Sequence, residues 1–197
     1  SYVSRACTIV TGFQGMLSAR KFKLVLLDRD GVINHDSADY IRNASEWSPI
    51  PGALQAIVAL QEAGIVVAVC TNQSGVGRGL LSASSLHEIH DTLQRCIEEL
   101  GGQRVSVYYC PHRPDAGCGC RKPEPGMLLD ALHDFGCDAR EACFVGDSAR
   151  DLQAAKRAGC EGILVRTGNG GATEKTVSNT IVFDNLATFA NHQRSII

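Results

Sequence analysis

The sequence predicts a doubly wound α/β domain, with a mostly parallel sheet covered by helices on both faces. Three observations predict this fold. Short apolar runs of strand length alternate along the chain with segments of helical apolar spacing. Proline and glycine mark the beginnings and ends of these helical segments. Polar side chains gather directly after the apolar runs, where ligands bind in open α/β sheets. This alternation calls for right-handed crossovers between parallel strands.

Length and composition are those of an ordinary globular domain. The chain has 197 residues, of which 44% are hydrophobic and 20% are charged. We expect residues 1–20 to form an N-terminal extension and residues 21–197 to form one domain. The formal net charge of −2 argues against general binding to nucleic acid or to an anionic membrane. No apolar run reaches the roughly 18 residues that a membrane span needs.

The cysteines indicate a reducing compartment. The chain contains nine of them, an odd number, and its N-terminus lacks the basic start and apolar core of an export signal. We therefore expect a cytoplasmic protein. A monomer is expected as well, because no long exposed apolar stripe is visible in the sequence.

The first predicted strand ends in two acidic residues. Residues 24–27 are continuous branched aliphatics, which suit a strand buried on both faces of a parallel sheet. Asp28 and Asp30 follow and should point the same way, with Arg29 between them, because side chains alternate along a strand. Neighbouring carboxylates repel each other and are costly to bury, so a bound cation or a chemical task would explain them. A plain turn at Asp30 and Gly31 is the alternative.

The remaining elements follow in order. Further strands are expected at residues 65–70, 105–109, 142–145, 163–166 and 180–183. Helices are expected at about residues 51–63, 83–100, 125–135, 148–158 and 184–193. Ser82 is the expected N-cap of the second helix. Polar loops are expected at residues 32–50, 72–79, 110–120 and 167–179.

Polar residues that follow four different strands should meet at one edge of the sheet: Asp28, Asp30, Thr71, Lys122 and Asp147. Asp28 and Asp147 offer the hard oxygen ligands that Mg²⁺ prefers. Thr71 offers a hydroxyl group, and Lys122 a compact positive charge, to a phosphoryl group. Taken singly, Thr71 is explained as a strand-end hydroxyl and Asp147 as a helix N-terminal acid. Taken together, the residues favour a magnesium and phosphate site.

A second constellation precedes Lys122. Cys110, His112, Cys118 and Cys120 supply three thiolates and one imidazole within eleven residues, a set suited to tetrahedral Zn²⁺. A closed four-ligand site is structural rather than catalytic, so zinc would fix this loop and place Lys122. A redox pair or unrelated surface thiols are the alternative.

These motifs, in this order, resemble those of the haloacid dehalogenase-like (HAD) phosphatase superfamily. The resemblance rests on residues 28–31, Thr71, Lys122 and residues 146–151, and it spans residues 22–166.

Within the superfamily, one branch is the most similar. Residues 28–34, residues 71–75 and the Cys/His loop look like those of the phosphatases that remove the 7-phosphate of D-glycero-D-manno-heptose 1,7-bisphosphate, in bacterial lipopolysaccharide and surface-sugar biosynthesis. Histidinol-phosphate phosphatases share much of this pattern and are the alternative. A non-enzymatic zinc-loop interaction module is a more remote one.

The resemblance implies a role for each residue at the sheet edge. Asp28 would attack phosphorus and carry an aspartyl-phosphate, while Asp30 would serve as general acid and then as general base. Mg²⁺ would be held by the Asp28 carboxylate, the Asp30 main-chain oxygen and Asp147. Thr71 and Lys122 would hold the phosphoryl oxygens.

Substrate selection should come from loops, because the chain has no room for a large cap domain. Only 20 residues separate Asp30 from Pro51, and the 50 residues between Thr71 and Lys122 already contain a helix, a strand and the zinc loop. Arg121 is expected to bind a second phosphate or polar substituents of the substrate, with Arg78 and Arg113 as weaker candidates. In the resembled family the residues at these positions approach the sugar: Asp36, Asp39, Asn72, Gln73 and Ser74. Asp151 is expected either to orient the metal site or to be a solvated helix acid.

Overall fold

The computed structural model describes residues 20–37 and 40–196 of the protein. Its strands are β1 (Leu24–Leu27), β2 (Val66–Asn72), β3 (Ser106–Cys110), β4 (Ala142–Gly146), β5 (Glu161–Val165) and β6 (Ile181–Phe183). Its helices are α2 (Ala53–Glu62), α3 (Ser74–Gly77), α4 (Ala83–Glu99), α5 (Gly126–Asp134), α6 (Ala149–Ala158), α7 (Gly170–Thr173) and α8 (Leu186–Ser195). Two 3₁₀ turns complete the described part, η1 (Ala44–Glu46) and η2 (Ala139–Glu141).

The strands form one six-stranded sheet of order β3-β2-β1-β4-β5-β6, in which every neighbouring pair is parallel. The chain builds outward from β1 to β3 and then returns to place β4 on the other side of β1. The order therefore reverses between β1 and β4, and such a reversal opens a crevice at the carboxyl ends of the two strands. The register pairs Leu27 with Val69 and with Val145, so β1 and β4 end at nearly the same level, whereas β2 continues to Asn72.

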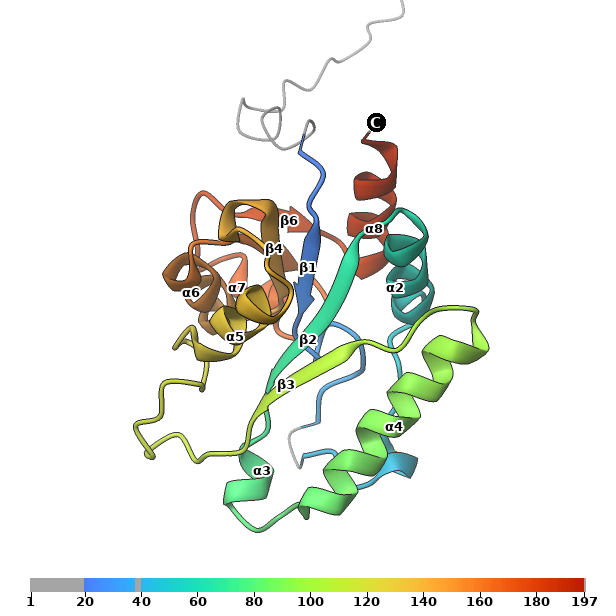
Figure 1. Cartoon of the computed structure of the whole chain (residues 1–197). Helices are drawn as coiled ribbons and strands as arrows, with labels where there is room; N and C mark the ends of the chain where they lie inside the picture. The colour runs from blue at the N-terminus through green and yellow to red at the C-terminus, as the bar shows by residue number, and fades with distance from the viewer. Residues whose placement is uncertain (1–19, 38–39, 197) are drawn as a thin grey trace, which may run out of the picture.

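Helices cover both faces of the sheet (Figure 1). The strand side chains alternate between these two faces. Val25, Leu27, Val69 and Val145 belong to the core shared with α2, α4 and α8. On the opposite face, side chains such as Leu26 and Phe144 pack against α5 and α6. Both sets are almost completely buried, which is why β1 and β4 are apolar at every position.

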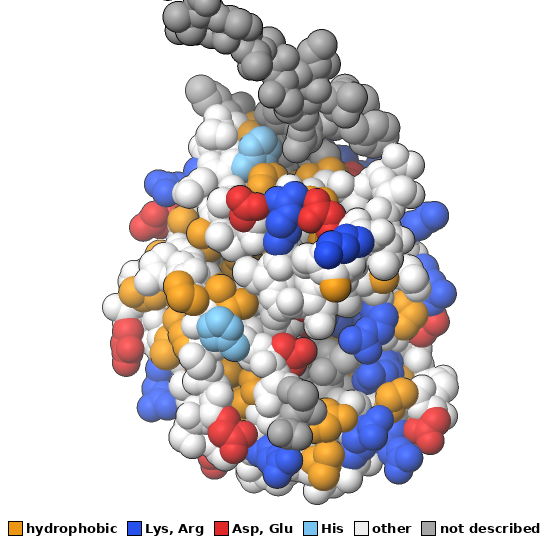
Figure 2. All heavy atoms as spheres, turned by 180° about the vertical axis from the view of Figure 1, so that it is seen from behind, with side chains coloured by type: hydrophobic (Ala, Val, Ile, Leu, Met, Phe, Trp, Pro, Cys, Tyr) orange, Lys and Arg blue, Asp and Glu red, His pale blue; other side chains and the backbone are white. Residues whose placement is uncertain are grey.

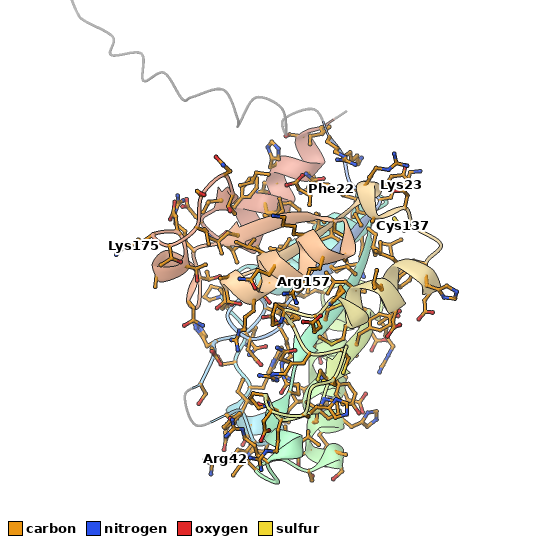
Figure 3. The ribbon with its side chains drawn as sticks, turned by 90° about the vertical axis from the view of Figure 1, so that its left-hand side faces the viewer. Phe22, Lys23, Arg42, Cys137, Arg157 and Lys175 are labelled. Carbon is orange, nitrogen blue, oxygen red and sulfur yellow. The ribbon has the colours of Figure 1, made fainter. Side chains whose placement is uncertain are left out.

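The two ends of the sheet differ. Phe22, Lys23 and Cys137 lie at one end of the molecule, whereas Arg42 lies at the other (Figure 3). Since Phe22 and Lys23 lead into β1, the end near Arg42 is the one toward which the parallel strands run. The polar residues that follow the strands gather there.

The predicted fold class is confirmed, and every predicted strand and helix is found within a few residues of its expected bounds. The Ser82 hydroxyl accepts a hydrogen bond from the Ser85 amide at 3.0 Å and so caps α4 as expected. The short helices α3 and α7 lie inside segments expected to be loops. The described residues contain no inserted cap domain. Residues 1–19 lie outside the described part, so the division at residue 20 stays a prediction.

No helix among the described residues combines the length and the apolar character that crossing a bilayer requires.

Candidate active site

A cavity of about 370 Å³ opens at the carboxyl ends of β1, β2 and β4. All but one of the predicted catalytic, magnesium and substrate-binding residues line it: Asp28, Asp30, Asp36, Thr71, Asn72, Gln73, Ser74, Arg121, Lys122 and Asp147. The exception is Asp39, which lies outside the described residues. Residues far apart in sequence therefore meet at one sheet edge, as their positions after the strands predict.

Lys122 is shared between two carboxylates. Its ammonium nitrogen lies 2.8 Å from Asp28 Oδ1 and 2.8 Å from Asp151 Oδ1, although the lysine side chain is only 2% exposed. Burial alone would lower the pKa of Lys122, but Asp151 and Asp28 outweigh it and raise the pKa. Lys122 therefore stays protonated and brings a fixed positive charge to the cavity.

The cavity also concentrates negative charge. Carboxylate oxygens of Asp28, Asp147 and Asp151 all lie within 4.8 Å of one another. Burial raises the pKa of Asp147 to about 6, with a further contribution from the charge of Asp151. Burial likewise raises the pKa of Asp28, against the opposing effect of Lys122.

This donor set fits a small divalent cation. Three carboxylates and one ammonium leave an excess of negative charge, which contributes, after burial, to the raised pKa values of Asp28 and Asp147. Mg²⁺ is bound in proteins through one or two carboxylates together with water and substrate phosphate. Asp28 and Asp147 are the candidates for such a cation, because one oxygen of each, Asp28 Oδ2 and Asp147 Oδ1, has no hydrogen bond to a described residue. Both oxygens of Asp151 are engaged, Oδ1 by Lys122 and Oδ2 by backbone amides.

Asp147 is held in place by the loop after β5. The Asn169 amide and side chain donate to Asp147 Oδ2 at 2.8 and 3.1 Å, and the Thr173 hydroxyl donates to the Asp147 carbonyl at 2.9 Å. Glycine is required where this carboxylate meets the β1 loop. Gly31 has φ +85°, and a Cβ there would lie 2.2 Å from Asp147 Oδ2. The segment after β5 therefore positions an acidic residue that directly follows β4.

The carboxylate of Asp30 is surrounded by donors. Arg29 donates from Nε to Oδ1 and from Nη2 to Oδ2, at 2.9 and 3.0 Å. The side-chain amides of Asn34 and Gln73 donate to Oδ1 and Oδ2, both at 2.9 Å. Burial alone would raise the pKa of Asp30, but the charge of Arg29 and these hydrogen bonds outweigh it and lower the pKa. Asp30 is thus ionised, and its carboxylate is not part of the acid cluster.

Two residues expected to approach the sugar have other partners. The Asn72 side chain accepts from the Lys122 amide at 3.0 Å and donates to the Lys122 carbonyl at 3.1 Å. The Gln73 side chain donates to Thr71 Oγ1 at 2.9 Å as well as to Asp30. Both residues line the cavity, and both fix a predicted catalytic residue. Contact with substrate by either of them stays a prediction.

Asp151 is a buried residue of the site and not a solvated helix acid, since its side chain is only 1% exposed. Its Oδ2 accepts from the amides of Asp147 and Ser148 at 3.2 and 3.0 Å and from the Ser148 hydroxyl at 2.7 Å. These bonds close a capping box at the start of α6. One carboxylate therefore joins the helix N-terminus to Lys122.

The predicted zinc ligands lie together in the segment after β3. Cys110, His112, Cys118 and Cys120 offer ligand atoms that all lie within 4.8 Å of one another. The Sγ atoms of Cys110 and Cys118 are 3.6 Å apart, and those of Cys118 and Cys120 are 3.5 Å apart. Tetrahedral zinc with Zn–S bonds of 2.3 Å would place neighbouring sulfurs about 3.8 Å apart. The set therefore fits Zn²⁺ closely.

The zinc loop is joined to the cavity on two sides. The Gln73 amide donates to the Cys110 carbonyl at 2.8 Å, and the Gly77 amide donates to the Pro111 carbonyl at 2.9 Å. On the other side, Arg157 of α6 donates to the Pro123 carbonyl at 3.2 Å; Figure 3 labels this arginine. The segment that carries Arg121 and Lys122 is thus tied to α3 and α6.

Basic side chains lie at the mouth of the cavity. Arg78, Arg121 and Arg150 line it, whereas Arg113 forms an ion pair with Asp115 and does not. Arg150 makes no hydrogen bond or ion pair with any described residue. The back view also shows several Lys and Arg side chains gathered over one side of the lower half of the molecule (Figure 2). The mouth is therefore suited to an anionic substrate.

The sequence patterns assign no role to three residues that hold the predicted ones: Arg29, Asn34 and Asn169. They also assign none to His90, whose Nε2 lies 3.3 Å from Nη1 of Arg29. Arg29 was expected only to lie between two acids, yet its side chain is 1% exposed and bound to Asp30. Asn34 is completely buried. An arginine and an asparagine within four residues of Asp30 were the available signal; for His90 and Asn169 the sequence offers none.

The fold and the site together define a class of hydrolase. The reversal of strand order beside β1, the aspartates after it, and a buried lysine shared with the acidic β4 turn are the features of HAD-like phosphatases. A family model described as HAD-hydrolase-like also matches residues 119–189.

Comparison with known proteins narrows this class. The chain is 47% identical over 170 residues to the D-glycero-beta-D-manno-heptose-1,7-bisphosphate 7-phosphatase of Pseudomonas aeruginosa, covering 85% of this chain and 96% of that protein. The enzyme of the same name from Pseudomonas putida is 48% identical, with 85% and 97% covered. The crystal structure of D,D-heptose 1,7-bisphosphate phosphatase from B. bronchiseptica, complexed with magnesium and phosphate, aligns with a TM-score of 0.83 at 45% identity, covering 86% of this chain and 96% of that one. The chain belongs to the D-glycero-D-manno-heptose 1,7-bisphosphate 7-phosphatase family and is a phosphoric monoester hydrolase.

Proposed function

We propose that this protein is a Mg²⁺-dependent phosphatase that removes the 7-phosphate of D-glycero-D-manno-heptose 1,7-bisphosphate. The observation that carries the proposal is the meeting of Asp28, Asp147 and Lys122 in one cavity of a chain of this family. The substrate is inferred from the relatives, and the type of reaction is inferred from the residues of the cavity.

The first half-reaction transfers the phosphoryl group to the protein. An oxygen of the Asp28 carboxylate attacks phosphorus, a P–O bond forms, and the bond from phosphorus to the sugar oxygen breaks. Asp30 delivers a proton to that leaving oxygen. Asp30 is ionised before substrate binds, but the negative charge of an adjacent phosphate raises the pKa of a carboxyl group and favours the required proton. Lys122 and Thr71 hold the phosphoryl oxygens meanwhile.

The second half-reaction releases phosphate. Asp30, ionised again, takes a proton from a water molecule that attacks phosphorus. The bond between phosphorus and the Asp28 oxygen then breaks, which restores the carboxylate and yields inorganic phosphate. The donors around Asp30 keep it ionised and suit it to this step.

Magnesium would be held by the Asp28 carboxylate, the Asp30 main-chain oxygen and Asp147. When bound, it supplies positive charge that allows an anionic carboxylate to approach an anionic phosphate. Zinc would be held by Cys110, His112, Cys118 and Cys120 and would be structural. Its task is to fix the loop that carries Arg121.

The second phosphate of the bisphosphate requires a separate anion site. A hollow of about 540 Å³ adjoins the cavity, and the two share Pro114, Arg121, Lys122 and Arg150. Since Lys122 is assigned to the phosphoryl group that is transferred, we assign the second phosphate to Arg121 and Arg150, whose guanidinium groups suit bidentate phosphate contacts. Arg78 lines the mouth nearby and is a weaker candidate.

The place of this reaction in surface-sugar biosynthesis, the cytoplasmic location and the monomeric state stay predictions. So do the assignment of residues 1–20 as an extension and the sugar contacts of Asp36, Asp39 and Ser74. Membership of a phosphatase family excludes the non-enzymatic interpretation. No structural observation favours histidinol phosphate as the substrate.

A substrate panel tests the proposal. Phosphate release is measured with each anomer of heptose 1,7-bisphosphate, with histidinol phosphate and with an aryl phosphate, with and without added Mg²⁺. We expect Mg²⁺-dependent turnover with kcat/KM highest on one heptose anomer. A higher kcat/KM on histidinol phosphate would overturn the substrate assignment, and full activity without Mg²⁺ would overturn the metal assignment.

A further inference from the structure

Arg29 is the largest of the fully buried side chains, and the mechanism above gives it no direct task. Its guanidinium lies between residues of two elements. On one side it donates two hydrogen bonds to the Asp30 carboxylate, at 2.9 and 3.0 Å. On the other side its Nη1 lies 3.3 Å from Nε2 of His90 in the middle of α4. A buried chain of contacts therefore runs from α4 through Arg29 to Asp30.

The His90 contact requires one form of the imidazole. A guanidinium has donors only, so His90 Nε2 must be an unprotonated acceptor and the ring proton must lie on Nδ1. The surroundings favour this neutral form, because burial and the charge of Arg29 lower the pKa of His90 to about 4. Asp30 after β1, together with His87 and Asp91 on α4, are the other charged or titratable groups around the ring. The Tyr109 ring of β3 packs against it with centroids 5.8 Å apart.

We propose that His90 is a positioning residue for the proton-transfer steps. His90 fixes the Arg29 guanidinium, and the fixed guanidinium sets the orientation of the Asp30 carboxylate toward the substrate. The inference rests on the proposed function, in which Asp30 carries the proton. Residues of α4 do not line the cavity, so a helix outside the cavity controls its acid–base group.

A packing role alone would make different demands. An apolar side chain of similar size would fill the space of the imidazole, but it would leave Arg29 Nη1 buried without an acceptor. An unsatisfied buried donor on a charged group is costly, so the guanidinium would shift toward another acceptor and carry Asp30 with it. A small displacement of a catalytic group is enough to slow a reaction severely. The acceptor at position 90, and not its volume, is the feature that matters.

Three variants separate the two roles. H90L removes the acceptor, H90Q restores one near the position of Nε2, and H87L makes the same apolar change on the exposed face of α4, where His87 is 76% exposed. For each variant, kcat, KM and the pH–rate profile are measured on heptose 1,7-bisphosphate and on an aryl phosphate. We expect H90L to lower kcat about tenfold, as loss of one charge-assisted hydrogen bond implies. KM should change less than about twofold, and the acid limb of the pH profile should move. H90Q should recover most of the activity, and H87L should match the wild type.

Several results would overturn the inference. One is H90L with a wild-type kcat and pH profile; another is H90Q impaired as strongly as H90L. If H90L does not fold, H90Q and the ¹⁵N chemical shifts of His90 in the wild type decide, since the inference requires an unprotonated Nε2 at neutral pH. A protonated Nε2 would contradict it. A wild type that hydrolyses no phosphate ester would overturn the proposed function itself, whereas an active wild type with an unaffected H90L overturns this inference alone.

Discussion

Lys122 Nζ and Asp151 Oδ1 lie 2.8 Å apart, and their side chains are 2% and 1% exposed. Lys122 also forms an ion pair with Asp28, so Asp151 fixes the ammonium group that lies beside the proposed nucleophile. Asp151 sits at the start of α6, and the helix and the phosphate-holding lysine therefore share one carboxylate.

Removal of that charge should damage both stability and catalysis. D151N leaves Lys122 with Asp28 alone and weakens the cap of α6. Loss of one partner of a buried ion pair costs about 3–5 kcal/mol, and the retained amide should reduce this loss. We expect a lower Tm and a kcat reduced more than about tenfold, measured by calorimetry and phosphate release. D130N, on the exposed face of α5, is the matched control. Unchanged kcat in D151N would show that Lys122 does not need this partner.

Substitutions of the two aspartates after β1 should impair catalysis in different ways. D28N cannot form the phosphoenzyme, so turnover should fall more than about 10³-fold while the fold is kept. D30N keeps the nucleophile but loses both proton transfers, and it should be severely impaired on substrates whose leaving group needs protonation. Acid quenching with labelled substrate should trap phosphate on wild-type protein and not on D28N. Trapped label on D28N would assign the nucleophile elsewhere.

The pH dependence of magnesium binding follows from Asp147. Its pKa is raised to about 6 in the folded protein, against about 3.9 for an unperturbed aspartate. The folded state binds the proton more tightly, so the resulting stability is complete below about pH 4 and is lost as the pH rises through about 6. Without Mg²⁺, this group should therefore lower Tm as the pH increases over that window.

Magnesium should reverse the loss. We expect the rise in Tm on adding Mg²⁺ to be larger at pH 7 than at pH 5, because protons compete with the cation at the lower pH. D147N should show little rise at either pH. Dialysis is used in place of a chelator, so that zinc is kept. An equal rise at both pH values would contradict the assignment of Asp147 as a ligand.

The zinc site gives a prediction of its own. Protein purified without chelators should contain about one zinc per chain, measured by elemental analysis. C118S should lose most of the zinc and have a lower Tm, because a short loop with little apolar packing depends on its metal. C137S, a cysteine outside the cluster, should keep both. Wild-type protein with far less than one zinc per chain would contradict the assignment of the Cys/His cluster as a zinc site.

Arg150 should act on the second phosphate only. R150A is expected to raise KM for heptose 1,7-bisphosphate about tenfold, which corresponds to one lost charge-assisted contact. An aryl phosphate has no second phosphate, and its KM should not change. K156A, on an exposed position of the same helix, is the control. Equal effects of R150A on both substrates would indicate a general electrostatic role.

Much of the fold and the site was predictable from local patterns. The continuous apolar runs of β1 and β4 predict central strands, which are buried on both faces. The polar residues that follow parallel strands must lie at the same edge of the sheet. Thr71, Lys122 and Asp147 were predicted for this reason, and the structure brings them together. The four predicted zinc ligands are close in sequence, so their clustering in the structure was predictable, while zinc itself stays a prediction.

The residues that hold the site were not predictable. The alternation of side chains along a strand predicts no contact between Arg29 and its neighbour Asp30. However, β1 ends at Leu27, and in the turn that follows the Arg29 side chain binds the Asp30 carboxylate. His90 looks like any polar residue on an amphipathic helix, and only the tertiary packing of α4 brings it to Arg29. Asn169 lies in a polar segment expected to be a plain connection. His90 and Asn169 are defined by long-range contacts, with Arg29 and Asp147, that no local pattern records.

The two hydrogen bonds between the Asn72 side chain and the main chain of Lys122 make the position of Lys122 independent of that of Arg121. They anchor the Lys122 backbone to β2, independently of the predicted zinc loop that precedes it. Arg121, one residue earlier, has no comparable anchor and depends on that loop. Removal of zinc should therefore weaken binding of the second phosphate by Arg121, while Lys122 stays in place beside Asp28 and phosphoryl transfer remains possible.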